Sequence, residues 1–370
     1  MDSELNLKAK RYSNANYILA IVDTLYLILV LILFQGLGLS LALARAVNNL
    51  SGQYYLAILL YLLVIFIFYY ILDFPLRLYR SFILEHKFNL SHQKIKDWLV
   101  DQAKGMTISF FIFIILGESF YYILNKFAYY WWVPVSLFWI LFSVILARLT
   151  PVLIIPLFFK YKILSDGILR ERILGLAEKM KIKILDVFEI DFSKKTLKAN
   201  AAFVGMGKTR RVILADTLKD KYTYDEIEVI VAHEFAHYQL KHLLKLLLVN
   251  SIATTLSFYI IFKTSHFILR FYNIDSLVDI AALPIILIYF VVLGTVATPL
   301  VNYISRSFEK DADKTALKTT GLKEGFISVM DKLAQQNLAD RNPSKIIKLF
   351  FFDHPPIDER ISSSQLRDVS

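Results

Sequence analysis

Apolar residues gather into six blocks along the chain, and polar connectors separate these blocks. Each block is close to the roughly 20 residues that an α-helix needs to cross the hydrocarbon core of a bilayer. Aromatic residues cluster at several block ends, as they do at membrane–water interfaces. The pattern predicts a mainly α-helical, polytopic membrane protein with about six transmembrane helices, at residues 17–44, 54–72, 106–124, 129–147, 243–262 and 282–303.

Basic residues are concentrated in alternate connectors. Lys and Arg are frequent in 73–105, in 148–242 and in the tail after residue 305, whereas the other connectors carry few of them. Cytoplasmic loops of multi-pass membrane proteins carry the excess of Lys and Arg. We therefore expect an integral, multi-pass protein with both termini and these three polar segments on the cytoplasmic side.

The longest polar connector has a secondary-structure pattern of its own. Its periodicity predicts a helix over 167–181 and strands within 182–190 and 199–214. A Gly205-Met-Gly207 turn divides the second of these strand regions, which is typical of a β-hairpin. The three polar segments are thus expected to form a cytoplasmic α+β domain with a small sheet.

A second helix is predicted where this connector meets the fifth span. Thr223 is followed three residues later by Glu226, the pattern of a hydroxyl N-cap with a reciprocal carboxylate. We expect this helix to run through His242 into the fifth span.

The composition limits the chemistry that the chain can perform. Hydrophobic residues make up 56% of its 370 residues, above the approximately 45–50% of soluble domains. It contains no cysteine, which excludes disulfides, thiolate metal sites and cysteine nucleophiles. The net charge of +10 fits topology signals and contacts with anionic headgroups. Membrane lipids are therefore expected partners, and nucleic acid is not.

The sequence His233-Glu234-Phe-Ala-His237 stands directly before the fifth span. Residues four apart share one face of a helix, so the two imidazoles can converge on one ion. Glu234 projects beside them, where it can act as a general base. This is the HExxH arrangement of zinc metallopeptidases.

A catalytic zinc takes three protein ligands and keeps one open position, so a third ligand must come from elsewhere. After the sixth span the sequence offers Glu309, with Asp313 one turn later on the same face of a helix. Glu309 is the predicted third ligand. Asp313 can accept a hydrogen bond from a ligand histidine and fix its tautomer. Asp311 is the competing ligand, although it points to a different face.

These motifs and several others together resemble the integral-membrane CAAX prenyl protease type 1 family of zinc metallopeptidases. The resemblance extends from about residue 70 to 361. It is carried by LYRSFILEHKFNLS (78–91), PVLIIPLFFKYKIL (151–164), KANAAFVGMGKTRRVILADTL (198–218), HEFAH (233–237), SRSFEKDAD (305–313) and DHPPIDERI (353–361). Eukaryotic members of the family have seven spans around a large water-filled chamber. The span that this chain lacks is expected to be amino-terminal.

The resemblance assigns a role to each matching position. It implies one Zn²⁺ per chain, bound by His233, His237 and Glu309, with Glu234 as the general base. Further implied roles are substrate contacts for Asn200 with Ala201 and Ala202 on an edge strand, oxyanion stabilisation for His354, and support of that histidine by Arg360. Without the resemblance, a lone histidine before two prolines is more often a loop residue than a catalyst.

The expected organisation follows from the spans and motifs. An N-terminal membrane region (1–147) has four spans and a cytoplasmic loop near 73–105, and a cytoplasmic protease segment (148–242) contains the hairpin and the HExxH helix. Two further spans (243–305) precede a C-terminal helical segment (306–370) with the third ligand and the HPP motif. Asp23 and Glu118 fall within predicted spans, where acidic residues are costly. They either line a polar cavity or make hydrogen bonds between helices.

The expected function is that of a membrane-embedded zinc metalloendopeptidase that hydrolyses peptide bonds near the cytoplasmic membrane face. Its substrate would be a peptide or protein, and the position of the motif beside the membrane favours a lipidated or membrane-associated one. One alternative is a quality-control protease of the heat-shock inner-membrane type. A zinc-binding transporter or scaffold is the alternative from another class, but it leaves the glutamate beside the histidines without a role.

Overall fold

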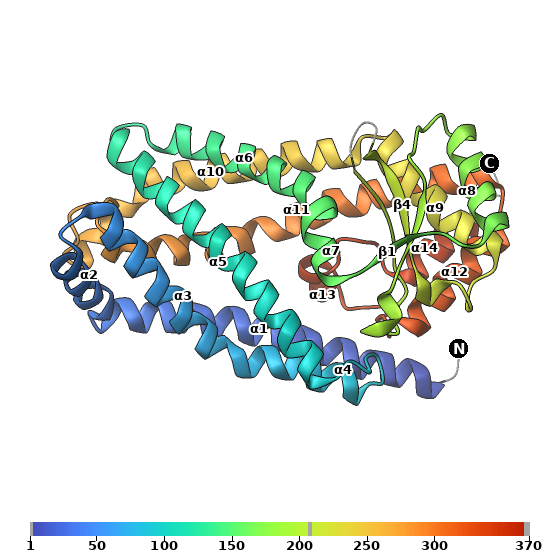
Figure 1. Cartoon of the computed structure of the whole chain (residues 1–370), viewed down its shortest axis with the longest axis horizontal. Coiled ribbons are helices and arrows are strands. Elements are labelled where there is room, and N and C mark those ends of the chain that lie inside the picture. The colour runs from blue at the N-terminus through green and yellow to red at the C-terminus, as the bar shows by residue number, and fades with distance from the viewer. Residues whose placement is uncertain (1–2, 206–208, 366–370) are drawn as a thin grey trace.

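The computed structural model describes residues 3–205 and 209–365, which form a long helical body with a small sheet at one end (Figure 1). Among these residues, six helices are long and apolar enough to cross a membrane, which confirms the predicted number of spans. They are built around α1 (Ser3–Gly36), α3 (Tyr54–Leu78), α5 (Ile95–Lys126), α6 (Trp132–Leu149), α10 (His242–Phe271) and α11 (Leu283–Thr320).

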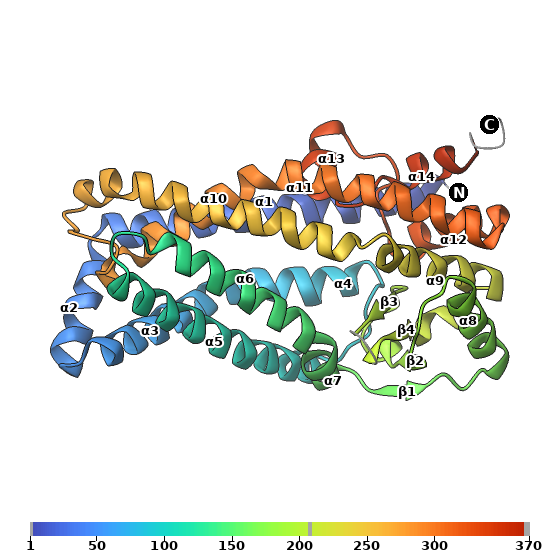
Figure 2. The ribbon, with the colours of Figure 1, turned by 90° about the horizontal axis from the view of Figure 1, so that it is seen from above.

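The long helices pack in neighbouring pairs. Helix α11 packs against both α1 and α10, α6 packs against α10, and α3 packs against α5 (Figure 2). The most apolar stretch of each candidate span is at most 39% buried within the protein. Their outward-facing apolar side chains therefore require lipid around them.

The predicted end of the first span was wrong. Helix α1 ends at Gly36, and residues 39–44 belong instead to a separate helix, α2 (Leu39–Ser51). Gly38 adopts a left-handed conformation, with a φ of 72°, that a glycine reaches without steric cost. Helix α2 lies across the end of the body opposite the sheet (Figure 1).

Glu118 and Asp23 both remain partly exposed on the spans. Glu118 lines an open cavity of about 510 Å³ near that same end, together with Tyr122 on the same helix and Tyr55 on α3. Neither acid forms a hydrogen bond or ion pair with another described residue, so the structure favours the cavity-lining interpretation for Glu118.

A mixed four-stranded sheet forms the other end of the molecule, in the order β1-β2-β4-β3. Its strands are β1 (Tyr161–Ile163), β2 (Val187–Ile190), β3 (Ala201–Val204) and β4 (Arg211–Ala215). Strands β3 and β4 are the predicted hairpin and pair antiparallel, with β3 at the edge. Gly205, which leads out of β3, has a φ of 96°, whereas Met206 and Gly207 lie outside the described residues.

Short helices pack around this sheet. The remaining helices are α4 (Leu84–Lys87), α7 (Ile155–Phe158), α8 (Gly167–Lys179), α9 (Tyr224–Gln239), α12 (Lys323–Gln336), α13 (Lys345–Phe351) and α14 (Ile357–Gln365). Helix α8 matches the helix predicted over 167–181. One hydrophobic core joins α8, α9 and α12 to strands β2 and β4. Helix α14 and the N-terminal end of α1 lie at this same end of the molecule (Figure 1).

Helix α9 begins where the sequence predicted. The Thr223 hydroxyl accepts from the Glu226 backbone, and the Glu226 carboxylate accepts from the Thr223 backbone N–H at 2.7 Å. Glu226 is itself buried and also accepts hydrogen bonds from Ser328 and Lys332 on α12. The N-cap thus ties α9 to its neighbour.

The prediction that this helix continues into the fifth span was wrong. Helix α9 ends at Gln239, and Lys241 takes a left-handed conformation with a φ of 57° before α10 begins at His242. A left-handed lysine is uncommon, so the local sequence does not favour this break. Because of this break, the HExxH helix and the span are two separate helices and can point in different directions.

Replacing Thr223 with alanine should lower the thermal stability of this domain. The change removes the side-chain acceptor of the cap, which costs about 1 kcal/mol in comparable helices. Thermal melting of the detergent-solubilised protein should show a lower midpoint for Thr223→Ala and a value near wild type for Thr223→Ser. Equal midpoints for the alanine and serine variants would contradict the role of the cap.

Candidate active site

Helices α9 and α11 bring two histidines and a glutamate to one point. One face of α9 (Val231, Ala232, Phe235 and Ala236) is buried in the core, so the HExxH side chains face the other way. His233 Nε2 and His237 Nε2 lie 3.0 Å apart. Glu309 is 4% exposed, and its two carboxylate oxygens lie 3.2 Å from His233 Nε2 and 3.1 Å from His237 Nε2.

Helix α11 sets the position of this glutamate. Its 38 residues correspond to a length of roughly 57 Å, well beyond a hydrocarbon core of about 30 Å. The same helix can therefore cross the membrane and continue, without a break, to the sheet. It places Glu309 where α11 packs against α9.

The geometry of the three side chains suits a metal ion. Ligand atoms about 2.0–2.2 Å from a tetrahedral zinc lie about 3.2–3.5 Å from one another, which is close to the spacing of these donors. One carboxylate oxygen of Glu309 is buried and accepts no hydrogen bond from the described residues. A metal ion held between this oxygen and the imidazole nitrogens would satisfy it.

The competing ligand from the sequence lies elsewhere. Asp311 is exposed on α11, whereas Glu309 is buried beside both imidazoles. The chain therefore brings Glu309, and not Asp311, to the histidine pair.

Asp313 and Arg360 form a second layer behind His233. An Asp313 oxygen lies 2.9 Å from His233 Nδ1, and the guanidinium of Arg360 donates to both oxygens of Asp313, at 2.8 and 2.5 Å. Asp313 thus directs the Nε2 atom of His233 toward Glu309. The hydrogen bonds of Arg360 to Asp313 place it behind the first histidine. The support of His354 by Arg360, which the resemblance implies, stays a prediction.

The carboxylates around His233 stabilise a positive charge at this position. Burial on its own lowers the pKa of His233, but the adjacent carboxylates of Asp313 and Glu309 outweigh it and raise the pKa to about 9. Burial likewise opposes the charge of Arg360, and the carboxylate of Asp313 overcomes it and raises the pKa of that guanidinium. The same two carboxylates that stabilise a proton on His233 would stabilise a metal ion there.

His354 reaches the site from the loop between α13 and α14. Its Nε2 atom lies 3.3 Å from a Glu309 oxygen, and its Nδ1 atom lies 2.8 Å from Asp353. Burial opposes protonation of His354, but Asp353 and the negative charge of Glu309 raise its pKa. Because its side chain is 53% exposed, it can also contact a substrate.

Two residues that sequence reasoning missed hold this arrangement together. Arg306, buried one turn before Glu309, donates to the carbonyl oxygens of Lys348 and Phe352 and so anchors the loop of His354. His242 lies 3.0 Å from His237 through their Nδ1 atoms. Arg306 falls within the quoted SRSFEKDAD motif and His242 is five residues after His237, but only the fold shows what they touch.

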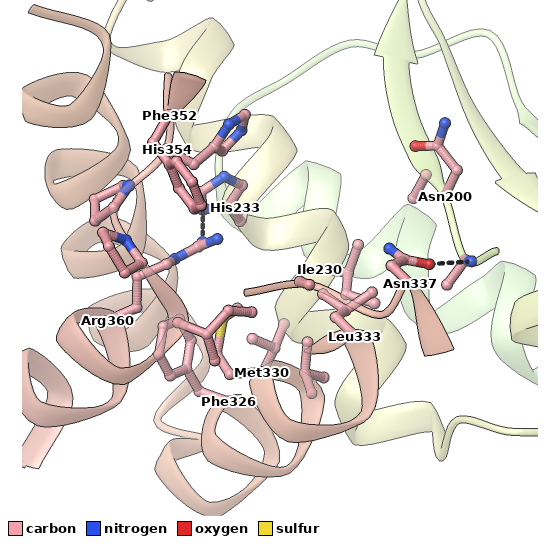
Figure 3. Close-up of a pocket in the computed structure, with 18 of the residues that line it drawn as sticks. Asn200, Ile230, His233, Phe326, Met330, Leu333, Asn337, Phe352, His354 and Arg360 are labelled. Atoms are coloured by element: carbon pink, nitrogen blue, oxygen red, sulfur yellow. Dashed lines mark hydrogen bonds between the residues drawn. The ribbon is translucent and has the colours of Figure 1, made fainter. Parts of the chain in front are cut away.

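A pocket of about 510 Å³ adjoins the histidines (Figure 3). His233, Glu234 and His354 line one part of it, and apolar residues of α9 and α12 form its wall. Ala201, the first residue of β3, and the preceding Asn200 also line it. Figure 3 shows Asn200 and Asn337 across the pocket from His233 and Arg360.

The main-chain groups of β3 alternate between β4 and the outer edge of the sheet, and this edge meets the pocket at Ala201. The carbonyl of Asn200 accepts from Ala215, so Asn200 and Ala202 direct their groups to β4 and Ala201 and Phe203 direct theirs outward. The edge is capped at one end, since the Asn337 side chain accepts from the N–H of Ala199 at 3.0 Å.

Comparisons with known proteins agree with this geometry. Residues 164–367 match peptidase family M48, and residues 1–160 match the CAAX prenyl protease N-terminal region with five membrane helices. An uncharacterised metalloprotease, YhfN of Bacillus subtilis, is 32% identical over 75% of this chain and 66% of its own length. CAAX prenyl protease 1 of Saccharomyces cerevisiae is 30% identical over 79% and 68%. The crystal structure of S. mikatae Ste24p superposes with a TM-score of 0.87 at 25% identity, over 98% of this chain and 90% of that one.

The fold and the site define a membrane-embedded metalloendopeptidase. The chain belongs to peptidase family M48 and, within it, to the CAAX prenyl protease type 1 family. These relatives do not favour the quality-control protease or the transporter and scaffold alternatives.

Proposed function

We propose that this metalloendopeptidase uses zinc and cleaves peptide or protein substrates, including lipidated or membrane-associated ones, at the cytoplasmic face of the membrane. The observation that carries the proposal is the convergence of His233, His237 and Glu309, whose ligand atoms all lie within 4.8 Å of one another. Nitrogen and oxygen donors of this kind are typical ligands of catalytic zinc. The sidedness rests on the basic connectors and on the shared end of α1, α14 and the sheet.

Each side chain of the site has a chemical task in this proposal. A bound zinc would supply Lewis acidity, which activates water and polarises the scissile carbonyl. Glu234, on the pocket side of His233, takes a proton from the attacking water and delivers it to the leaving amine. His354 donates to the oxyanion that develops on the carbonyl. Asp313 holds His233 in the orientation that exposes its Nε2 atom.

The substrate would bind in extended form along the outer edge of β3. Ala201 and Phe203 present the main-chain groups that an added strand can pair with. Asn200 and Ala202 direct their main-chain groups to β4, so the substrate contacts that the resemblance implies for them would have to be made by their side chains. The hydrogen bond that the Ala199 N–H donates to the Asn337 side chain occupies this end of the edge. The stretch from Ala201 onward is therefore left as the pairing surface.

Replacing Ala201 with proline should weaken peptide cleavage without releasing the metal. The change removes an outward N–H and leaves the pairing of β3 with β4 intact. Loss of one such hydrogen bond should lower kcat/KM roughly tenfold. Peptide kinetics and metal analysis would check this, with Ala201→Ser as the control that keeps the N–H. An unchanged kcat/KM for the proline variant would show that substrates do not pair with this edge.

The lipid preference can be tested with one peptide in two forms. The purified protein would be given a fluorogenic peptide with and without a prenyl group on one residue, in the same detergent. A substrate held partly by the spans should be cleaved with a higher kcat/KM when it carries the prenyl group. Equal values for both forms would remove the lipid from the proposal and leave a peptidase of broader substrate range.

A further inference from the structure

His242 is a buried histidine that the reaction itself does not use. It is the first residue of α10 and is 1% exposed. Its ring stacks on Phe308 at a centroid distance of 4.6 Å and an interplanar angle of 9°. Phe308 directly precedes Glu309 on α11, and the ring of His242 also lies against His237 on α9, so His242 contacts both helices that carry the three proposed ligands.

The two ring nitrogens of His237 face different partners. Its Nε2 atom lies 3.1 Å from Glu309 and 3.0 Å from His233 Nε2, so this is the nitrogen on the metal side. Its Nδ1 atom lies 3.0 Å from Nδ1 of His242. A hydrogen bond between two Nδ1 atoms needs a proton on one ring and a lone pair on the other.

Only one of the two possible proton placements is compatible with metal binding. If His237 carries the proton on Nδ1 and donates it to His242, its Nε2 lone pair is free for a cation. If His242 donates instead, a neutral His237 must carry its proton on Nε2, which blocks the metal. The partner of the second nitrogen therefore selects the tautomer of a ligand histidine.

We propose that His242 is a positioning residue that accepts the Nδ1 proton of His237 and thereby holds His237 in the tautomer and orientation that bind the metal. Asp313 performs the same task for His233 with a carboxylate. The site thus uses a charged acceptor behind one ligand and a neutral acceptor behind the other. This inference rests on the proposed metal site.

The proposed proton placement has a cost at His242 itself. When His242 accepts through Nδ1, its own proton lies on Nε2. That nitrogen is buried and has no hydrogen-bond partner among the described residues. A buried unpaired N–H is unfavourable, so binding of the metal by His237 must offset this cost.

Three substitutions of His242 distinguish the effect of its hydrogen-bond acceptor from the effect of its aromatic ring. Asn and Leu have nearly the same shape, but His242→Asn places an acceptor oxygen near the position of Nδ1 and His242→Leu does not. His242→Phe keeps an aromatic ring against Phe308 and removes the acceptor. Zinc affinity of the full-length protein in detergent would be measured by competition with a chelator, and thermal melting would confirm that each variant is folded.

We expect His242→Leu and His242→Phe to bind zinc about 10–100-fold more weakly than wild type, the usual effect of losing a partner behind a ligand. His242→Asn should stay within about threefold of wild type, because it restores the acceptor. A Leu or Phe variant that binds zinc as tightly as the Asn variant would overturn the inference. Failure of the wild-type protein itself to bind zinc would instead overturn the proposed metal site.

Discussion

Substituting glutamine for Glu234 should abolish peptide hydrolysis while the protein keeps its metal. Glutamine has the shape of glutamate but cannot accept a proton from water, so the general base is lost. The metal should remain, because Glu234 lines the pocket and is not one of the three converging side chains. Removal of a general base typically costs about 10²–10⁴-fold in rate, and we expect a loss in this range.

The measurement is kcat/KM on a fluorogenic peptide together with the metal content of the same preparation. Glu228→Gln is the matched control, because Glu228 lies on the same helix but pairs with Arg172 away from the pocket. It should retain near wild-type activity. Equal hydrolysis by wild type and Glu234→Gln would show that the activity belongs to a contaminant.

Substituting glutamine for Glu309 should release the metal. The change removes the negative charge that faces both imidazoles, and with it the third proposed ligand. The loss of zinc affinity should exceed the approximately 10–100-fold that follows from losing an outer partner, and peptidase activity should fall with it.

Asp311→Asn is the control for this experiment, because Asp311 is the competing carboxylate two residues away. It is exposed on α11, so its loss should leave zinc affinity near the wild-type value. The account would be wrong about the third ligand if Asp311→Asn lost the metal and Glu309→Gln retained it. Chelator competition on both variants, with melting curves to show that each is folded, distinguishes the two results.

Local periodicity was sufficient to predict much of this molecule. The six spans follow from the length of apolar segments, and the N-cap of α9 follows from the spacing of Thr223 and Glu226. The meeting of His233 with His237 follows from helical geometry. The carboxylate pair on α11 was predictable for the same reason, because Glu309 and Asp313 are also four residues apart.

Features that depend on distant contacts could not be predicted in this way. The break at Lys241 has no sequence signal, since lysine rarely adopts a left-handed conformation. Strand β1 has only three residues and pairs with β2, from which α8 separates it in the sequence. The partner of Arg360 could not be inferred either, because Asp313 is forty-seven positions away in the chain and meets it only in the fold.

Diffraction data from crystals of the wild-type protein, collected on both sides of the zinc absorption edge, test the central claim most directly. The account predicts one anomalous peak per chain, about 2.0–2.2 Å from His233 Nε2, His237 Nε2 and a carboxylate oxygen of Glu309. A protein that holds no ion between these side chains, or that binds zinc only through other residues, would contradict it.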